Sequence, residues 1–367
     1  MSGYFNSAIN LHRYLVNEHW TGNNLAGPDP VGKIHWRVTR FLRSYFPWIP
    51  YEDQYIYLQG QSYWIKSNQV LYQITNEQKY FDLIENTSNY IVDQQLIDGA
   101  WLHPPIRGRK GFISSVEGGW ASLGLITAFR TTGNQAFLAS AINWFNFLVD
   151  NIGFQKVGNG LAVNYYAHSN TIVPNVTTKI IWLSAELNHI TKKEHFLNCT
   201  DEMIQFIENS QLDSGEIPYA IPNRTHFMCF QYNAFQFLDL ANYFEISKNE
   251  RCRRILVKLV SFLATGMTEQ GSCRYSCSKS HPEVIYWNGA LAAALRKAQE
   301  LGFGDYLELS ERAYSRLFSQ QNPNGSFGFS KYNYGLLQDK RSYPRYQSMI
   351  LYHLLIRAQR DVSNSPR

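Results

Sequence analysis

Three loops of the same design lie far apart in the chain: Gln95-Leu-Ile-Asp-Gly99-Ala-Trp101, Gln211-Leu-Asp-Ser-Gly215-Glu-Ile217 and Gln321-Asn-Pro-Asn-Gly325-Ser-Phe327. Each has a glutamine, a glycine four residues later and a large apolar residue two positions after the glycine. A fourth copy, Gly271-Ser-Cys273, lacks the glutamine, and the most degraded copy lies near Gly160. A loop that recurs in this way indicates a chain built from structural repeats.

The glycines give the length of the repeat. Gly215 and Gly271 are 56 residues apart, and Gly271 and Gly325 are 54 apart. Each unit has room for two helices, and apolar residues recur with the period of an amphipathic helix before each loop. We therefore predict a helical hairpin in every repeat. The first, inner helices are expected to begin near Gln61, Val116, Val176, Phe227, Val284 and Arg345.

Only five outer helices follow these six inner ones. The sixth is expected from the N-terminal region, residues 5–18 or 33–45, packed beside a helix over residues 346–357. This closes an all-α ring, an (α/α)6 toroid of six hairpins. The predicted organisation is a single domain over 1–367, with closing helices in 1–59, hairpin repeats in 60–358 and a flexible tail in 359–367. The alternative is an open solenoid, whose repeats are shorter, about 34–47 residues.

Composition excludes several classes of protein. Of 367 residues, 44% are hydrophobic and 17% charged, which excludes a disordered chain. The net charge is only +5 without a basic run, so nucleic acid is not an expected partner. No apolar stretch is long enough for a membrane span, and the first twenty residues do not resemble a signal peptide. With five cysteines and no CxxC pair, we expect a cytoplasmic protein; the oligomeric state stays open.

The Gln-x3-Gly-x-Trp loops resemble the repeat motif of terpenoid cyclases and protein prenyltransferases. The six-hairpin layout over about residues 60–358 also resembles (α/α)6 glycoside hydrolases, polysaccharide lyases and glucuronyl 5-epimerases. The resemblance implies the toroid fold but does not single out one of these reactions. It also implies that Trp101 and Phe327 mainly tie one hairpin to the next.

Long loops precede the inner helices, so a site is expected at the N-terminal ends of these helices. The formal net charge of these loops, lysines and arginines less aspartates and glutamates, is +2 in 96–116, +1 in 152–175, −1 in 210–227, 0 in 266–283 and +3 in 321–345. These loops thus account for the whole net charge, which predicts an anionic substrate. Aromatic residues between the charges can stack on sugar rings. The predicted substrate-binding residues are Arg107, Arg109, Trp120, Tyr166, Asn233, Arg274, Tyr286, Trp287, Tyr343 and Arg345.

Two sets of residues are candidates for catalysis. His226 and Tyr232, with Asn233 and an arginine, could remove the proton alpha to a uronate carboxylate. Glu117 and Glu283 both start inner helices and could face each other as acid and base on a glycosidic bond. Each set also has a structural explanation: a capped helix start with a buried histidine for the first, and ordinary capping by glutamates in a first helical turn for the second.

No cofactor is expected. An alternative is a metal site in Cys273-x3-Cys277-x3-His281, although this spacing matches no common zinc pattern. We predict a carbohydrate-active enzyme for an acidic polysaccharide or oligosaccharide, active in polysaccharide biosynthesis or processing as an epimerase, lyase or hydrolase. The alternatives are a terpenoid-cyclase or prenyltransferase-like enzyme, for which an Asp-x-Asp-Asp cluster is missing, and a noncatalytic toroid that binds carbohydrate or protein.

Overall fold

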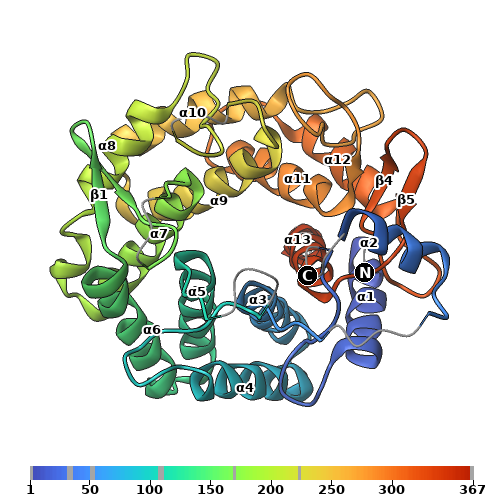
Figure 1. Cartoon of the computed structure of the whole chain (residues 1–367), viewed down its shortest axis with the longest axis horizontal. Coiled ribbons are helices and arrows are strands. Elements are labelled where there is room, and N and C mark those ends of the chain that lie inside the picture. Colours follow the sequence, from blue (N-terminus) through green and yellow to red (C-terminus); the bar gives the residue numbers. More distant parts are fainter. Residues whose placement is uncertain are drawn as a thin grey trace.

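The computed structural model describes residues 3–30, 36–49, 54–105, 111–167, 171–221 and 225–363. Helices alternate between an inner and an outer layer around a ring (Figure 1). The inner helices are α3 (Leu58–Thr75), α5 (Ser115–Thr132), α7 (Pro174–Thr191), α9 (Cys229–Ser247), α11 (Ile285–Glu300) and α13 (Pro344–Ser363). The outer helices are α4 (Gln78–Asp93), α6 (Gln135–Phe147), α8 (Thr200–Ser210), α10 (Glu250–Ala264), α12 (Leu307–Phe318) and α1 (Gly3–His19). The predicted (α/α)6 toroid is confirmed.

The glutamines of the repeated loops join neighbouring hairpins. Each side-chain amide donates to the carbonyl of the loop glycine and to a carbonyl of the next outer helix. Gln95 bonds Ser140 of α6, at 3.0 Å between nitrogen and oxygen. Gln211 bonds Ile255 of α10 at 3.1 Å, and Gln321 bonds Ser7 of α1 at 2.9 Å. The helix α1 therefore takes the place of the sixth outer helix, beside α13 (Figure 1).

The loop glycines are required by the same contact. Gly99, Gly215, Gly271 and Gly325 have φ values of 93°, 92°, 83° and 89°, a conformation that glycine adopts without strain. A Cβ atom on any of them would lie 2.3–2.7 Å from a backbone oxygen of the facing outer helix. The glycine of the motif is thus required because the loop backbone packs closely against the outer helix of the next hairpin.

The two helix layers differ in their sequence because they differ in burial. The outer helix α10 buries one face, through Cys252, Ile255, Leu256, Leu259, Val260, Phe262 and Leu263. Inner helices are enclosed nearly all round, and in α11 the buried residues run almost continuously from Ile285 to Leu295. A helix that is apolar on every side is typical of a protein interior.

Short strands occur in the loops, which the all-α prediction did not include. A hairpin of β1 (Phe154–Val157) and β2 (Gly160–Val163) forms at the degraded loop near Gly160. The strands β3 (Glu283–Val284), β4 (Ser330–Asn333) and β5 (Leu337–Asp339) form an antiparallel sheet in the order β3-β4-β5. The helix α2 (Trp36–Tyr45) packs on β5.

The C-terminal boundary also differs from the expectation. The helix α13 continues to Ser363, so the tail predicted from residue 359 is helical over its described part. Residues 364–367 lie outside the described residues. No helix in the described part of the chain is long and apolar enough to cross a membrane.

Candidate functional site

A cavity of about 260 Å³ lies at the N-terminal ends of the inner helices, in the middle of the ring. This is the end at which the long loops predicted a site. Five of the predicted residues line it: Glu117, Trp120, Tyr232, Tyr286 and Arg345. The other polar and aromatic lining residues include Tyr57, His103, Tyr165, Asn175, Lys179, Tyr219, Gln231 and Tyr346.

Glu117 lies in the first turn of α5, where the Ser114 side chain caps the helix by accepting a hydrogen bond from the Glu117 backbone nitrogen. The Glu117 carboxylate accepts hydrogen bonds from the backbone nitrogens of Leu58, at 2.7 Å, and Gln59, at 3.3 Å, at the start of α3. Both use Oε2. Burial raises the pKa of Glu117, and the charge of Arg345 offsets only part of this effect. Glu117 is therefore fixed in place and exchanges a proton closer to neutral pH than an exposed glutamate.

Arg345 is buried beside this carboxylate and is held on several sides. Its Nη2 atom lies 2.8 Å from a carboxylate oxygen of Asp29 and donates a hydrogen bond to the Tyr346 hydroxyl. The guanidinium stacks over the Tyr57 ring at 3.9 Å. Asp29 thus neutralises much of the charge that the sequence analysis assigned to binding a substrate carboxylate.

Three tyrosines from different helices converge on the cavity. The Tyr286 ring stacks on Tyr346 with centroids 4.3 Å apart, and its hydroxyl accepts a hydrogen bond from Gln231 at 2.8 Å. Tyr232 packs edge-on against Tyr219 at 4.4 Å. Burial raises the pKa of Tyr232 and of Tyr286 well above the ordinary value of 10.0. Both phenols therefore keep their protons across the physiological range and are proton donors.

The floor of the cavity carries buried charges. Lys179 lies 3.5 Å from the centroid of the Trp120 ring and donates to both oxygens of Asp239, at 3.1 and 3.0 Å. Behind them, Lys66 lies over the Trp182 ring at 4.4 Å. Burial, with repulsion from Lys179, lowers the pKa of Lys66 to about 7. The two lysines together exceed the charge of Asp239 whenever Lys66 is protonated.

Glu283 does not face Glu117 across the cavity, as the two-carboxylate arrangement requires. It points between hairpins and forms an ion pair with Arg316 of α12, at 2.7 Å. Ser272 and Gln320 donate further hydrogen bonds to it, at 2.7 and 2.6 Å. Burial alone would raise the pKa of Glu283, but Arg316 and Ser272 outweigh it, and the pKa is lowered. This carboxylate joins neighbouring repeats.

Asn233 also serves the fold. It is fully buried, accepts a hydrogen bond from the Ile217 backbone nitrogen at 2.8 Å and donates to the Ile217 carbonyl at 3.0 Å. Gln347 of α13 holds Phe327 in the same way, at 2.9 and 2.7 Å. The expected contact of Asn233 with substrate is incompatible with this arrangement, because its amide is occupied by the repeated loop.

Four more predicted binding residues lie outside the lining of the central cavity. Trp287 is buried and stacks on Tyr275, with centroids 5.2 Å apart. Tyr343 is buried and donates to Asp339 at 2.7 Å. Arg274 is half-buried in the loop after α10, and Tyr166 packs against Tyr165 behind the cavity wall. Arg107 and Arg109 lie outside the described residues.

His226 and the predicted metal residues are placed apart from the cavity lining. The His226 side chain is 58% exposed, and its Nδ1 atom lies 2.6 Å from Oε2 of Glu216. Cys273 is buried with its sulfur toward the Arg274 carbonyl, and His281 packs against the Tyr332 ring. Cys277 lies instead with Cys229, whose sulfur is 3.2 Å away. The Cys273-Cys277-His281 set is thus not assembled in the structure.

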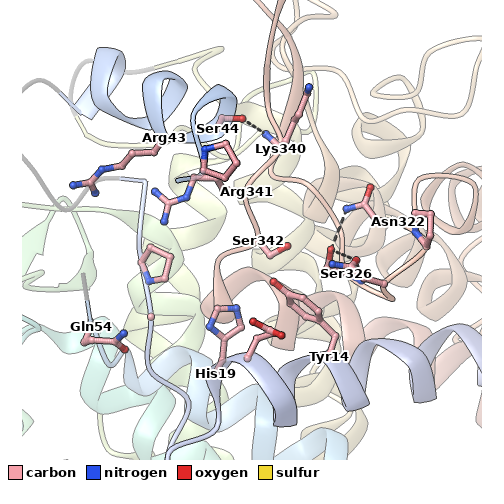
Figure 2. Close-up of a pocket in the computed structure, with 16 residues that line it drawn as sticks. Tyr14, His19, Arg43, Ser44, Gln54, Asn322, Ser326, Lys340, Arg341 and Ser342 are labelled. Atoms are coloured by element: carbon pink, nitrogen blue, oxygen red, sulfur yellow. Dashed lines mark hydrogen bonds between the residues drawn. The ribbon is translucent and has the colours of Figure 1, made fainter. Parts of the chain in front are cut away.

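A second, larger cavity of about 850 Å³ opens on the same end of the ring, between α1, α2 and the loops on either side of β4 and β5. We call it the basic groove, because Arg43, Lys340 and Arg341 line it, with Glu18 as a single carboxylate among its described lining residues. Figure 2 shows the Arg43 and Arg341 guanidinium groups on one side, across from Asn322 and Ser326. Burial lowers the pKa of Arg341 to about 10, and the positive charge of Arg43 also lowers it. A small void lined by Pro28, Tyr57 and Arg345 separates this groove from the central cavity.

Sequence reasoning missed Lys179 and Gln231 and did not assign a role to His103. Lys179 could have been recognised from the sequence, because a charged residue inside an otherwise apolar inner helix needs a buried partner. Asp239 of α9 has the same character and is that partner. His103, in a loop, has no such sign, and its placement depends on the path of the chain.

Comparisons with known proteins support the fold. No family model matches the chain, and no curated protein matches it by sequence. The structure resembles cellobiose 2-epimerase from Bacillus thermoamylovorans, with a TM-score of 0.76 and 11% identity over 97% of this chain and 100% of that one. It also resembles a GH76 α-mannanase from Bacteroides thetaiotaomicron (TM-score 0.71, 11% identity, 99% and 97% covered) and a polysaccharide lyase (TM-score 0.67, 12% identity, 100% of both chains covered). The chain therefore has the six-hairpin α/α-toroid fold that these carbohydrate-active enzymes share.

Proposed function

We propose that the protein is a carbohydrate-active enzyme that transfers a proton at a carbon atom of an acidic saccharide, as an epimerase or a lyase. The observation that carries this proposal is Glu117: a buried carboxylate with a raised pKa, facing tyrosines in the central cavity. Groups with shifted pKa values in a cavity are typical of acid–base catalysis. The similarity to an epimerase and a lyase agrees with this chemistry.

The size and lining of the central cavity suit one sugar unit. Its volume is close to the lower end of the roughly 300–1,000 Å³ of small-molecule sites. Trp120, Tyr286 and Tyr346 line the cavity with aromatic rings, while Gln231 and Asn175 offer amides for hydroxyl groups. Aromatic faces with polar edges match a sugar ring, which has an apolar face and polar rim.

The proposed step moves one proton from carbon to Glu117. The ionised Glu117 removes the proton alpha to the substrate carboxylate, and the electron pair of that bond forms an enolate. Tyr232 then donates its proton: to the opposite face of the same carbon in an epimerase, or to the leaving oxygen as the neighbouring C–O bond breaks in a lyase. Lys179, in the floor of the cavity, is placed to donate to the oxygen on which the negative charge of the enolate develops.

Hydrolysis by two carboxylates has less support. Among the described residues, Glu117 is the only carboxylate that lines the central cavity. Glu283, the expected partner, is bound to Arg316. An acid–base pair across a glycosidic bond needs a second carboxyl group about 5–9.5 Å away, so the proton-transfer chemistry fits this cavity better.

The acidic character of the substrate is inferred from the basic groove. Arg43, Lys340 and Arg341 face a cavity large enough for further sugar units, and arginine binds carboxylates with two parallel hydrogen bonds. A saccharide chain with one unit in the central cavity has this groove available on the same end of the ring. The groove thus takes over the role that the sequence analysis gave to Arg345.

Incubation with uronate oligosaccharides and with cellobiose in deuterated water tests the proposal. Deuterium at the carbon alpha to the carboxylate indicates an epimerase, a new conjugated double bond a lyase, and a new reducing end alone a hydrolase. Glu117→Gln and Tyr232→Phe should lower the rate by roughly 10²–10⁴-fold, whereas Cys199→Ser, a half-buried site outside the cavity, should not. Full activity of Glu117→Gln, or exchange into cellobiose but not into uronates, would contradict the proposal.

A further inference from the structure

Three side chains of types that can bind metals lie close together beside the central cavity, and they come from three separate segments of the chain. Glu216 follows α8, Cys229 begins α9, and Cys277 lies in the loop after α10. The two sulfur atoms are 3.2 Å apart, and the Cys277 sulfur lies 3.8 Å from Oε2 of Glu216. The three ligand atoms all lie within 4.8 Å of one another. Met228, next to Cys229, lines the cavity.

We propose that Glu216, Cys229 and Cys277 bind a zinc ion, with His226 as the fourth ligand. Sulfur, carboxylate oxygen and imidazole nitrogen are the ligand types that zinc takes in tetrahedral sites. With bonds of about 2.3 Å to sulfur and about 2.0–2.2 Å to oxygen, a tetrahedral ion holds two sulfurs about 3.8 Å apart. The sulfur–sulfur distance of 3.2 Å is shorter than this, and the 3.8 Å from the Cys277 sulfur to Glu216 is close to it, so a small separation of the two sulfurs brings these three ligands to a tetrahedral arrangement.

The charge of Glu216 also points to a cation. Its side chain is completely buried, and a buried carboxylate needs a compensating positive charge. Among the described residues, the basic side chain in contact with it is His226, which is mostly exposed. A zinc ion between the carboxylate and the two sulfurs supplies the missing charge, and the two thiol protons pass to solvent on binding.

The backbone around His226 has a conformation that needs contacts to hold it in place. His226 and Met228 both have left-handed conformations, with φ of 58° and 46°, which cost energy for residues other than glycine. Such conformations persist where surrounding contacts hold them. Here Glu216 accepts hydrogen bonds from the His226 backbone at 2.6 Å and, through Nδ1, from its ring. Turning Nδ1 from the carboxylate oxygen to the ion closes the site, and the exposed ring and the exposed Cys277 leave a path for the metal.

The experiment measures zinc content and affinity in the full chain, without reference to activity. After reduction, equilibration with zinc and desalting, mass spectrometry of the metal should find about one zinc per chain, and cobalt substitution should give a thiolate-to-cobalt absorption band. Competition with a chromophoric chelator gives the dissociation constant. Cys277→Ser, at an exposed position, should weaken binding by more than the roughly 10–100-fold typical of losing an outer-shell partner. His226→Ala should weaken it by at least tenfold.

The matched control is Cys199→Ser, a cysteine outside the cluster, which should bind zinc like the natural sequence. Absence of zinc in the reduced chain, or unchanged affinity in Cys277→Ser, overturns the proposal. A chain that lacks zinc and carries a Cys229–Cys277 disulfide, seen as a mass lower by two hydrogens and two blocked thiols, overturns it as well. If Cys277→Ser fails to fold, Glu216→Gln with the cobalt band as readout keeps the proposal testable, since the band should be lost or shifted.

Discussion

The contact that closes the ring can be tested at a single glycine. Gly325 has φ of 89°, and a Cβ atom there would lie 2.5 Å from the Asn10 carbonyl oxygen of α1. Gly335 has nearly the same backbone conformation, φ of 82°, but nothing lies within 4 Å of the added Cβ. Alanine at the two positions thus incurs the same kind of backbone strain, and only Gly325→Ala also displaces a helix.

The expected losses of unfolding free energy differ accordingly. A left-handed residue other than glycine costs about 1–2 kcal/mol, which is the whole effect expected for Gly335→Ala. At Gly325, overpacking against α1 adds about 1–3 kcal/mol, and weakening the Gln321 hydrogen bond to Ser7 adds about 0.5–1.5 kcal/mol. The total is about 2.5–6.5 kcal/mol.

Thermal unfolding followed by calorimetry and circular dichroism measures the difference. With an unfolding entropy of about 2.1 cal/mol/K per residue and 367 residues, Gly325→Ala should lower Tm by about 3–8 °C. For Gly335→Ala, the same entropy gives about 1–3 °C. Equal shifts for the two variants would refute the closure of the ring by α1 at this loop.

Three further predictions concern charged groups. Burial raises the pKa of Glu117, so activity that needs its ionised form should already fall at a pH where an exposed glutamate is still ionised. A pH profile of kcat/KM should show this decrease at acidic pH, and the profile of Glu117→Gln should lack it. Lys66 has a pKa lowered to about 7, so from about pH 7 up to its ordinary 10.5 the unfolded chain binds the extra proton, and stability should rise with pH. Denaturant titrations should show that rise in the natural sequence and a flatter curve for Lys66→Met; parallel curves would argue against a neutral Lys66. Removing Arg43 and Arg341 together should weaken the binding of uronate oligosaccharides, measured by calorimetry, and reduce the salt dependence of that binding. Binding of neutral oligosaccharides is the control and should be unaffected.

The fold was predictable because the repeated loop encodes a contact between hairpins. The glutamine of each loop reaches the next outer helix, and the glycine permits the close approach, so the same letters recur wherever the same contact recurs. Gln321 and Gly325 make this contact with α1, the helix that the count of six inner and five outer helices had placed in the N-terminal region. The strands β1–β5 depend on individual loops and left no repeated pattern.

The candidate site was predictable only to within one helical turn. Neighbouring residues in a helix point about 100° apart, so the position of a residue near the start of an inner helix does not determine whether it faces the cavity. Tyr232 and Tyr286 line the cavity, whereas Asn233 and Trp287, each one residue later, face the adjoining hairpin. The rotation of each inner helix is fixed by packing between repeats, which sequence alone does not specify.

Glu117 and Glu283 show how packing decides the function of similar residues. Both are buried glutamates at the start of inner helices. At Glu283, the outer helix α12 presents Arg316, and the ion pair at 2.7 Å keeps the carboxylate ionised and lowers its pKa. Burial raises the pKa of Glu117, and the two backbone N–H groups that donate to one of its oxygens offset only part of this increase. An arginine within hydrogen-bonding distance stabilises the ring but makes a carboxylate a poor base, so the glutamate without such a bond is the one available for proton transfer.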